Sequence, residues 1–380
     1  AKVEYFSFSS DTKFATLASR ILGGDPVDMF PYEWDAVPNG VTKEQYQPLD
    51  DYLDLSDDIW SDMSDVIEMF KYKDKHYVVP YCLSDPLLIT YNRSLCEENG
   101  LDDPYELYKK DKWDWDAFMD MMKTFVSNAK DGETRYGING WFGQAMVQST
   151  GETFVKYDGS KFSNNISNPA IEEAEGVMEE IMSLGLYDPT WYGYLPDDGS
   201  TLFFGMADWA LGASNVKADP NPDYEDDGFV EENDLMIVPF PKQPGSDEYY
   251  LNCNFGAKML VKNSDKGDAV AAYIKCERLA AMIDEYKDAA KEKAIIPEVN
   301  AQGKLKSYVT EEQYDALQDY KDPKNITPVF DFGYGMGSRM YGDGEYTYET
   351  RGVMNNLTSA LLNGDKDSWA VLRDEWSSVI

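Results

Sequence analysis

The sequence is short of the side chains on which many enzymes and metal sites depend. Its 380 residues include one histidine, His76, and four cysteines that show no Cys-x-x-Cys spacing. It contains no Gly-x-Ser-x-Gly nucleophile elbow and no Gly-x-x-x-x-Gly-Lys phosphate loop. These absences exclude a histidine-based metal cluster, and they favour buried or unpaired thiols over a disulfide framework.

Positive charge and long apolar runs are scarce as well. The chain carries 70 acidic against 34 basic residues, a formal net charge of -36. Nucleic acids and anionic membranes both attract positive charge, so neither is expected as a direct partner. The longest apolar runs, such as residues 86–89 and 259–261, have the length of strands. Because a helix needs about 20 apolar residues to span a bilayer, no membrane crossing is expected.

Aromatic residues are what the chain has in quantity: 27 tyrosines, 17 phenylalanines and 9 tryptophans. Flat apolar faces pack on the C–H patches of sugar rings, while tyrosine hydroxyls, amides and carboxylates replace the water around sugar hydroxyls. The composition therefore suggests a protein that holds an uncharged polar ligand, with carbohydrate as the first hypothesis. For any single tyrosine, a place in the core is the simpler interpretation.

Helical and strand patterns alternate along the chain, which predicts an α/β fold with two or three domains. Residues 14–22 place apolar side chains at i, i+3, i+4, i+7 and i+8, and Gly23 and Gly24 end that helix. Asp114 and Asn168 are expected to cap two further helices. Strands are predicted at residues 27–30, 77–80, 87–91, 235–238 and 257–261.

Several segments, taken in order, resemble a known family. Residues 24–28, Gly-Asp-Pro-Val-Asp, follow the first helix and resemble the Gly-x-x-Pro-Asp signature of extracellular solute-binding proteins that serve ABC importers. The branch concerned includes maltose-binding protein. Further segments similar to stretches typical of that family are residues 47–52, 75–80, 91–101, 113–118, 202–207, 238–241 and 263–274. The resemblance thus covers nearly the whole chain.

The resemblance implies a two-lobed α/β fold, the type II periplasmic-binding-protein-like fold, with a ligand cleft between lobes that are joined by hinge crossings. Lobe one would comprise residues 1–90 and 254–305, and lobe two residues 91–253 and 306–380. The crossings would fall near residues 89–92, 252–255 and 305. Relatives have a strand, a helix and a second strand before the first helix, whereas only residues 2–9 precede it here. Either lobe one lacks its first βα unit, which is the expectation, or a disordered stretch is missing from the sequence before this helix.

The same resemblance implies an extracytoplasmic binding protein, not an enzyme, that captures an oligosaccharide in the cleft and delivers it to the permease subunits of an ABC importer in the membrane. Such a protein would be a monomer that binds no nucleic acid and needs no cofactor. It would be a cell-surface lipoprotein of a Gram-positive bacterium or a periplasmic protein. Closing of the lobes would let one ligand be contacted from both sides, shielded from water.

The resemblance also indicates which segments would line the cleft. In lobe one these are the loop after residues 27–30 and the loop after residue 80. In lobe two they are the end of a strand predicted to stop near Asn139, the region of Asn215, and the tyrosine-rich stretch before the C-terminal helix. The candidate ligand-binding residues are Tyr32, Trp34, Asp35, Tyr81, Ser84, Asp85, Trp141, Phe142, Gln144, Asn215, Tyr334, Tyr346, Tyr348 and Arg351.

Some of these tryptophans have a structural alternative. Trp34 beside Asp35 would give a ring face and a hydroxyl partner, or Trp34 would only pack its own loop. Trp141 and Phe142, which lie between glycines, would be exposed at a strand end or would fill the core. Trp209 takes the place of a buried methionine of the family and is predicted to be a core residue.

An acidic stretch near residue 230 has the spacing of a calcium-binding loop. Oxygen ligands would come from loop positions 1, 3, 5, 9 and 12, with Gly228 at position 6. Position 12 is aspartate instead of the bidentate glutamate, and no helical pattern precedes the loop. The alternative is a solvated acidic loop. The candidate ligands are Asp223, Glu225, Asp227, Glu231 and Asp234.

Two other classes of function stay open. A glycoside hydrolase needs only two carboxylates about 5 to 9.5 Å apart, and the chain has 70 acidic residues. The other class is a binding protein for a peptide, a polyamine or a metal. The acidic balance favours a cation, whereas the tryptophans and tyrosines favour rings, with cation–π stacking as the exception.

Overall fold

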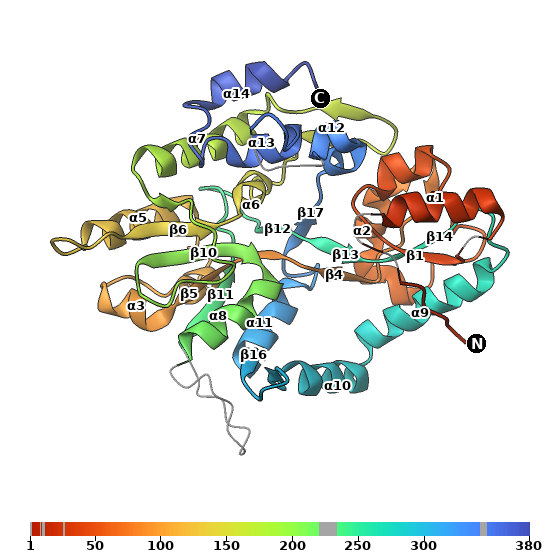
Figure 1. Ribbon diagram of the computed structural model, residues 1–380, viewed down its shortest axis with the longest axis horizontal. Coiled ribbons are helices and arrows are strands. Elements are labelled where there is room, and N and C mark those ends of the chain that lie inside the picture. The colour runs from red at the N-terminus through yellow and green to blue at the C-terminus, as the bar shows by residue number, and fades with distance from the viewer. Residues whose placement is uncertain (1, 8, 10–11, 26, 220–233, 343–347) are drawn as a thin grey trace.

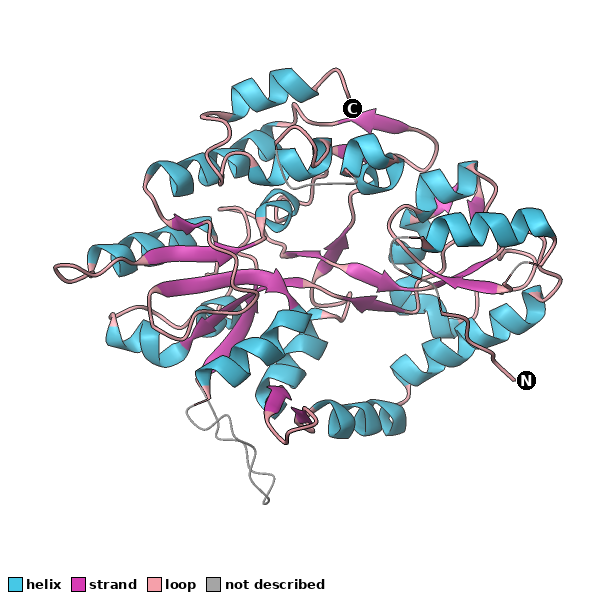
Figure 2. Ribbon diagram, viewed as in Figure 1, coloured by secondary structure: helices cyan, strands magenta, loops and turns pink. Residues whose placement is uncertain are grey.

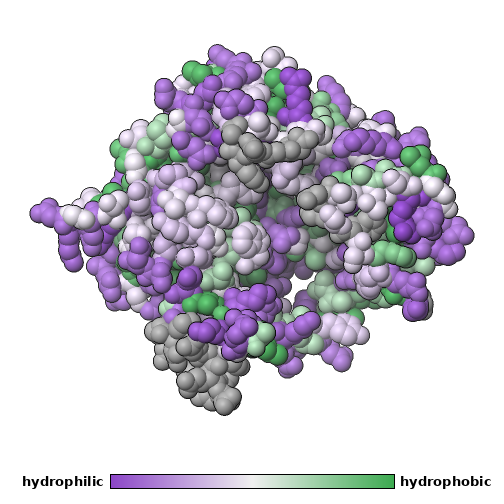
Figure 3. Space-filling model, viewed as in Figure 1, coloured by the Kyte–Doolittle hydropathy of each residue, from purple (hydrophilic) through white to green (hydrophobic). Residues whose placement is uncertain are grey.

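The computed structural model describes residues 2–7, 9, 12–25, 27–219, 234–342 and 348–380. Two α/β lobes lie side by side along the long axis of the molecule (Figure 1). The space-filling view shows a hollow at the middle of the molecule, between the lobes (Figure 3). This is the two-lobed α/β fold that the resemblance implies, and that prediction is confirmed.

The elements alternate between helix and strand over most of the described chain. The helices are α1 (Lys13–Gly23), α2 (Ser64–Met69), α3 (Arg93–Glu98), α4 (Pro104–Lys109), α5 (Trp115–Ser127), α6 (Gly143–Gln148), α7 (Pro169–Ser183), α8 (Leu211–Ala218), α9 (Gly267–Met282), α10 (Asp284–Ala294), α11 (Glu311–Tyr320), α12 (Ser338–Tyr341), α13 (Val353–Ser359) and α14 (Trp369–Trp376), with short helical turns η1 (Ala36–Gly40), η2 (Asp58–Met63), η3 (Asp208–Ala210) and η4 (Phe332–Met336). The strands are β1 (Met29–Pro31), β2 (Lys71–Tyr72), β3 (Lys75–His76), β4 (Cys82–Ser84), β5 (Leu87–Asn92), β6 (Tyr136–Gly140), β7 (Val155–Tyr157), β8 (Phe162–Asn164), β9 (Tyr187–Asp188), β10 (Thr201–Ala207), β11 (Leu235–Pro239), β12 (Tyr250–Asn252), β13 (Asn254–Gly256), β14 (Lys258–Leu260), β15 (Glu298–Val299), β16 (Leu305–Ser307) and β17 (Thr327–Val329).

Lobe two is organised around a five-stranded sheet in the order β11-β5-β10-β6-β9 (Figure 2). Strands β10, β6 and β9 pair in parallel, and β5 runs antiparallel between β10 and β11. Helix α5 packs on β6, while α4 and α11 pack on β11. Because helices cover its faces, the inner strands are buried along almost their whole length, as continuous apolar runs require.

Helices α5 and α7 form where their capping residues predict them. The Asp114 carboxylate caps α5 by accepting a hydrogen bond from the Ala117 N–H at 3.0 Å, and the Asn168 side chain caps α7 through the Ala170 N–H at 2.9 Å. Helix α1 also has the predicted bounds, but its predicted apolar stripe is only partly inward. Leu17 is fully buried, whereas Leu22 is 89% exposed because it lies in the last turn, where no neighbouring element covers it.

Lobe one consists of short two-stranded sheets covered by α1, α2 and α9. Strand β14 pairs with β1, and a bridge between Tyr46 and Val261 extends this sheet on its other side. The prediction of a strand at residues 77–80 is wrong. That segment is largely buried but irregular, because Pro80 has no N–H to donate to a ladder, and the strand forms instead at β4.

Three segments carry the chain between the lobes. Strand β4 leads into β5, and the antiparallel strand β13 follows directly after β12. Helix α10 is the third connection, because Lys291 forms ion pairs with Glu311 at 2.8 Å and Asp315 at 2.7 Å on α11. The first crossing lies earlier than predicted, since residues 89–92 belong to an inner strand of lobe two. The third begins at α10 rather than near residue 305.

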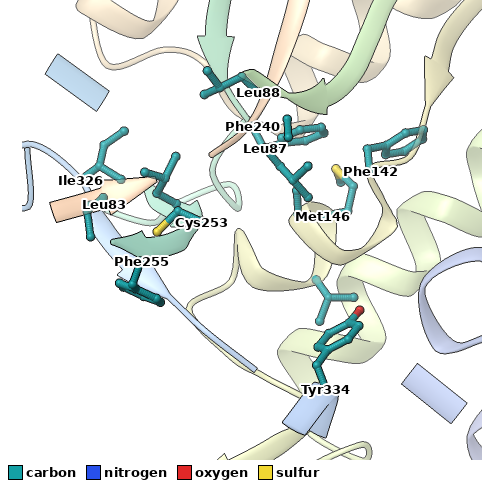
Figure 4. Packing of buried hydrophobic residues seen from close by; sticks show 14 of the residues in the cluster. Leu83, Leu87, Leu88, Phe142, Met146, Phe240, Cys253, Phe255, Ile326 and Tyr334 are labelled. Atoms are coloured by element: carbon teal, nitrogen blue, oxygen red, sulfur yellow. The ribbon is translucent and has the colours of Figure 1, made fainter. Parts of the chain in front are cut away.

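Aromatic rings fill one side of the contact between the lobes. The Phe70 ring of lobe one lies 5.4 Å from Phe330 and 5.5 Å from Phe332, which follow β17. Figure 4 shows Leu83, Cys253 and Phe255 gathered close by, where β4 and β13 cross between the lobes. We call the following residues the interlobe aromatic cluster: Tyr32, Phe70, Phe255, Phe330 and Phe332.

Candidate ligand-binding site

The carboxyl ends of three parallel strands of lobe two lie at one edge of its sheet. Strand β6 ends at Gly140, β9 at Asp188 and β10 at Ala207. Strand β5 starts from the same edge, because Leu87 pairs with Ala207. Figure 1 shows the arrowhead of β10 near the middle of the molecule, and Figure 3 shows the hollow in that region. Ligands of open α/β sheets bind outside the carboxyl ends of the strands, so this edge is the candidate site.

Each of these three strands is followed by a tryptophan. Trp141 comes directly after β6, Trp209 comes two residues after β10, and Trp191 comes three residues after β9. Trp191 is 60% exposed and Trp209 is 56% exposed, while Trp141 is partly exposed. Large apolar side chains that gather in the open on one surface indicate a binding site more often than scattered ones do. We call Trp141, Trp191 and Trp209 the tryptophan row.

A sharp turn at the end of β6 directs Trp141 outward. Gly140 has φ +106, and a Cβ at this position would lie 2.2 Å from the Gly205 carbonyl oxygen, so only glycine fits. The Trp141 N–H then donates to that same carbonyl at 2.9 Å. Phe142 turns the other way, is buried, and stacks on Phe240 at 6.1 Å. The two adjacent aromatic side chains therefore lie on opposite sides of the turn, with Trp141 partly exposed and Phe142 buried. The ligand contact predicted for Phe142 is wrong, because its ring fills the core.

Trp209 is exposed because β10 ends before it. The strand takes residues 201–207, which leaves Trp209 in η3, beyond the sheet edge, and the prediction that it belongs to the core is therefore wrong. Its neighbour Asp208 is held on both sides. The Asp208 N–H donates to the Pro86 carbonyl at 3.1 Å, and its carboxylate forms an ion pair with Lys321 at 2.9 Å. The positive charge of Lys321 is therefore neutralised by the protein itself.

The segment between β4 and β5 contributes Asp85 to this edge. Asp85 is exposed and has φ +45, a backbone conformation that aspartate tolerates better than most residues. Ser84 is partly buried opposite Asn254 in the β4–β13 pair. Tyr81 is buried, and this burial raises the pKa of its hydroxyl. Of the three residues predicted in this loop, Asp85 is the one presented to solvent. In lobe two, Gln144 is partly exposed in the first turn of α6.

The predicted aromatic residues of lobe one are engaged in packing. Trp34 stacks on Tyr334, with ring centroids 5.4 Å apart and planes 9° apart, and Tyr341 meets it edge-on at 4.1 Å. Tyr32 is a buried member of the interlobe aromatic cluster. These contacts favour the alternative in which Trp34 serves packing. Its ring holds its own loop against η4 and α12, which come much later in the chain.

Asp35 is the polar residue of the same loop. Its carboxyl is partly buried, and one oxygen, Oδ1, has no hydrogen-bond partner among the described residues. Burial, followed by the nearby Glu33 carboxylate, raises the pKa of Asp35 to about 6, while Lys43 and Lys13 oppose the shift. A carboxyl with an unused acceptor suits a hydroxyl donor, but this oxygen is buried and out of reach of solvent.

The remaining lobe-two candidates do not join the sheet edge. Asn215 is fully buried, and its amide donates to the Tyr308 carbonyl at 2.8 Å and to Gln313 Oε1 at 2.7 Å. The ligand contact predicted for Asn215 is wrong, because the face of α8 that carries it is turned toward β16 and α11. Tyr348 packs on Trp376, and Arg351 bonds to Ser359 and Asp365, so both stabilise the C-terminal helices. Tyr346 lies outside the described residues.

The calcium prediction falls almost wholly outside the described residues. Asp223, Glu225, Asp227 and Glu231 are not described, and the Asp234 carboxylate accepts a hydrogen bond from the Ser94 hydroxyl. Within the described ranges, no group of three or more histidine, cysteine, aspartate or glutamate residues is placed to hold a metal ion. All four cysteines are free, and Cys96 and Cys253 are buried. Calcium binding stays a prediction.

Comparison with protein families identifies the chain. Residues 1–276 match the family model described as bacterial extracellular solute-binding protein. The chain belongs to this family. Comparison with curated protein sequences gives no match.

Solved structures of similar fold include several sugar-binding proteins. A sugar transporter from Rhizobium etli in an open conformation has a TM-score of 0.68 at 14% identity, over 99% of this chain and 91% of that one. The sugar-binding protein MalE from Xanthomonas citri has a TM-score of 0.65 at 14% identity, over 97% and 86%. The galacto-N-biose-/lacto-N-biose I-binding protein of the ABC transporter from Bifidobacterium longum, in complex with lacto-N-biose, has a TM-score of 0.63 at 12% identity, over 100% and 87%. At this identity the likeness shows the fold alone.

In this extracellular solute-binding protein, the carboxyl edge of the lobe-two sheet carries Trp141, Trp191 and Trp209 after its strands and the exposed Asp85 before β5. In the part of the chain that the structure describes, no helix has the length and apolar character to span a bilayer.

Proposed function

We propose that this solute-binding protein captures an oligosaccharide in the hollow between its lobes and delivers it to the permease subunits of an ABC importer. The tryptophan row is the observation that carries this proposal. Sugar rings present C–H patches to aromatic faces, and the three rings at the sheet edge would accommodate more than one sugar unit. The sugar-binding proteins among the structures of similar fold add support, because they share the lobed architecture.

The charges at this edge favour an uncharged ligand. Lys321, the basic group beside Trp209, is paired with Asp208 and is not free to hold a phosphate or carboxylate. Asp85 is exposed and can accept hydrogen bonds from hydroxyl groups. A neutral polyol fits both observations. Its hydroxyl groups need hydrogen-bond acceptors and its rings need aromatic faces, but it needs no oppositely charged side chain.

The proposal extends to the setting in which the protein works. We place it outside the cytoplasm, in a periplasm or at a Gram-positive cell surface as a lipoprotein, where it acts as a monomer. Closing of the lobes on the sugar would be what the permease recognises, because it brings the sheet edge of lobe two toward lobe one. Loss of sugar uptake on deletion of the gene, and its return on complementation, would test delivery to an importer.

Titration of the protein with a panel of oligosaccharides tests the binding step. We expect a saturable change of tryptophan fluorescence and a matching calorimetric isotherm with at least one sugar, which mass spectrometry then recovers intact. Shortened products would show a glycoside hydrolase instead. A saturable response to spermidine together with no response to any sugar would show a polyamine-binding protein. Either result would overturn the proposal.

A further inference from the structure

The loop that follows β9 presents an exposed aromatic side chain, that of Trp191, for which the described residues supply no ring contact. Residues 189–194 read Pro-Thr-Trp-Tyr-Gly-Tyr, and we call them the β9 loop. Tyr194 has structural contacts, since it lies 6.2 Å from the Tyr192 ring and beneath the Lys217 ammonium at 4.8 Å. Trp191 has no ring contact and no hydrogen bond with any other described residue, although it is the largest side chain of the loop. Its exposure therefore calls for a functional explanation.

The backbone that carries Trp191 is nevertheless held firmly. The buried Asn139 amide donates to the Asp188 carbonyl at 2.8 Å and to the Thr190 carbonyl at 2.6 Å. The Thr190 N–H donates to the Asp188 carboxylate at 2.9 Å, which closes a turn directly before Trp191. An exposed ring on a fixed backbone loses little conformational freedom when a ligand stacks on it.

Other contacts tie the β9 loop to the start of the Trp141 turn. The Tyr187 hydroxyl donates to the Gly140 carbonyl at 3.2 Å, and the Tyr187 ring meets Phe142 at 5.8 Å. Strand β9 and the segment that carries Trp141 are therefore joined by direct contacts, which place the start of the β9 loop beside the Trp141 turn.

The order of the strands sets the order of the binding groups. Asp85 precedes β5, Trp209 follows β10, Trp141 follows β6 and Trp191 follows β9, and these strands are successive neighbours. With strands about 4.8 Å apart, the row from Asp85 to Trp191 spans roughly 14 Å, which exceeds one sugar ring. Strand β9 is the last strand on this side of the sheet, so Trp191 is the outer end of the row.

We infer that Trp191, assisted by Tyr192, forms an outer sugar subsite that only oligosaccharides long enough to extend past Trp141 can fill. This inference rests on the proposed sugar-binding function and adds a determinant of ligand length to it. Short sugars would be held by Asp85, Trp209 and Trp141 alone. Longer sugars would gain one more stacked ring, and hence affinity, from the β9 loop.

Isothermal titration of the full chain with linear oligosaccharides of two to six units, in the linkages that bind wild-type protein, tests the inference. We expect Trp191→Ala to weaken the longest binding sugars about 10-fold and to leave the shortest within about twofold, while Trp191→Phe keeps most of the affinity. Leu184→Ala, an exposed apolar residue next to the end of α7, is the matched control and should change neither. Because Trp191 is exposed, the variant is expected to keep the wild-type melting temperature.

The outcomes separate the inference from the function on which it rests. Equal losses for short and long sugars would overturn the outer subsite, because Trp191 would then contact the first ring. Unchanged affinity for every sugar would also overturn it and would point to a protein partner for the β9 loop. Wild-type protein that binds none of these sugars would overturn the proposed function, and the subsite with it.

Discussion

The tryptophans of this protein differ in what their side chains contact. Trp113 is fully buried and donates its indole N–H to the Pro239 carbonyl at 2.8 Å, so its place in the core is complete. Trp34 is occupied by Tyr334 and Tyr341. Trp209, by contrast, leaves most of its ring in solvent, although neighbouring Asp208 is fixed by Lys321. A ring that lies mostly outside the core while its backbone is fixed is available to a ligand.

Replacement of Trp209 by alanine should therefore weaken sugar binding without loss of stability. We expect an affinity loss of about 10-fold, about 1.4 kcal/mol, for every sugar that binds, because the strand order places Trp209 between Asp85 and Trp141, where even short sugars are expected to lie. The melting temperature should stay that of the wild-type protein, since little buried surface is removed. Calorimetric titration and thermal unfolding measure both quantities. Leu22→Ala on α1, which removes an even more exposed apolar side chain, should leave both unchanged.

Asp331, unlike Trp209, is expected to affect the stability of the protein. It is buried and accepts backbone hydrogen bonds from Phe154 at 2.6 Å, Gly333 at 2.8 Å and Val155 at 3.3 Å. Burial raises its pKa to about 7, although these N–H groups lower it. Because the pKa of Asp331 is higher in the folded state than the unfolded value of 3.8, the folded state binds this proton more tightly. The contribution of the protonated carboxyl to the free energy of unfolding is therefore fully present below about pH 4. That contribution is lost as the pH rises through 7.

Replacement of Asp331 by asparagine should destabilise the protein and flatten its pH dependence. Asparagine has one acceptor oxygen, so at least one of the three N–H groups loses its partner, at a cost of about 1–3 kcal/mol. Urea unfolding at pH 5 and pH 8 measures the free energy of unfolding of both proteins. The wild-type value should fall between these pH values, and the variant value should fall less, because Asp331 no longer titrates. Asp131→Asn, at an exposed turn, is the control; an equal pH slope in D331N and wild type would contradict this account.

At the scale of elements, the ends of β6 and β10 determine where the tryptophan row lies. Gly140 and Gly205 face each other in the parallel pairing of these strands. A Cβ on Gly205 would lie 2.7 Å from the Phe142 Cβ, and one on Gly140 would meet the Gly205 carbonyl. The close approach lets the chain reverse after β6, so that Trp141 points out and Phe142 points in.

Replacement of Gly140 by alanine should disturb both stability and binding. The positive φ and the collision with Gly205 are each expected to cost on the order of 1–3 kcal/mol. Sugar affinity should fall as well, because Trp141 moves with the turn. Gly176→Ala is the matched control: Gly176 is exposed in the middle of α7 with open space around it, so alanine should stabilise by about 1 kcal/mol. Urea unfolding of both variants, together with sugar titration, makes the comparison; wild-type affinity in G140A would refute the role of the turn.

Elements with local signals were predictable from the sequence, and their assembly was not. Asp114 and Asn168 cap their helices through contacts within a few residues, which pattern and capping rules capture. The segment at residues 77–80 has strand-forming residues, yet Pro80 and the pairing of β4 with β13 decide its structure. Leu22 fits an inward stripe, but only the tertiary neighbours determine that nothing covers it.

The candidate site was predictable only in part, for the same reason. Trp141 and Asp85 were expected because loops at strand ends commonly line a cleft. Trp191 had a signal in the sequence, an aromatic pair between Pro189 and Gly193, but its meaning depends on β9 lying beside β6. The fate of Asn215 depends on Tyr308 and Gln313, which are distant in sequence, so no local pattern could reveal its burial.

At the scale of the whole molecule, the lobes are coupled by more than their hinge crossings. The interlobe aromatic cluster joins lobe-one residues such as Phe70 to Phe330 and Phe332 of the returning chain. The β7–β8 hairpin of lobe two also reaches lobe one, where the Tyr157 hydroxyl donates to the Lys71 carbonyl at 2.8 Å. Unfolding of one lobe would expose these rings in the other. We therefore expect the lobes of the wild-type protein to unfold in one cooperative transition.

Replacement of Phe70 by alanine should break this coupling. The fully buried ring contacts both lobes, so its loss should cost about 3–5 kcal/mol and should separate the calorimetric transition into two. Phe125→Ala is the matched control, because its ring is equally buried but lies within α5 of lobe two. That variant should lose a similar free energy while it keeps a single transition. If F70A unfolds in one transition with a calorimetric enthalpy equal to the van't Hoff enthalpy, the rings do not couple the lobes, and the hinge strands β4 and β13 must do so alone.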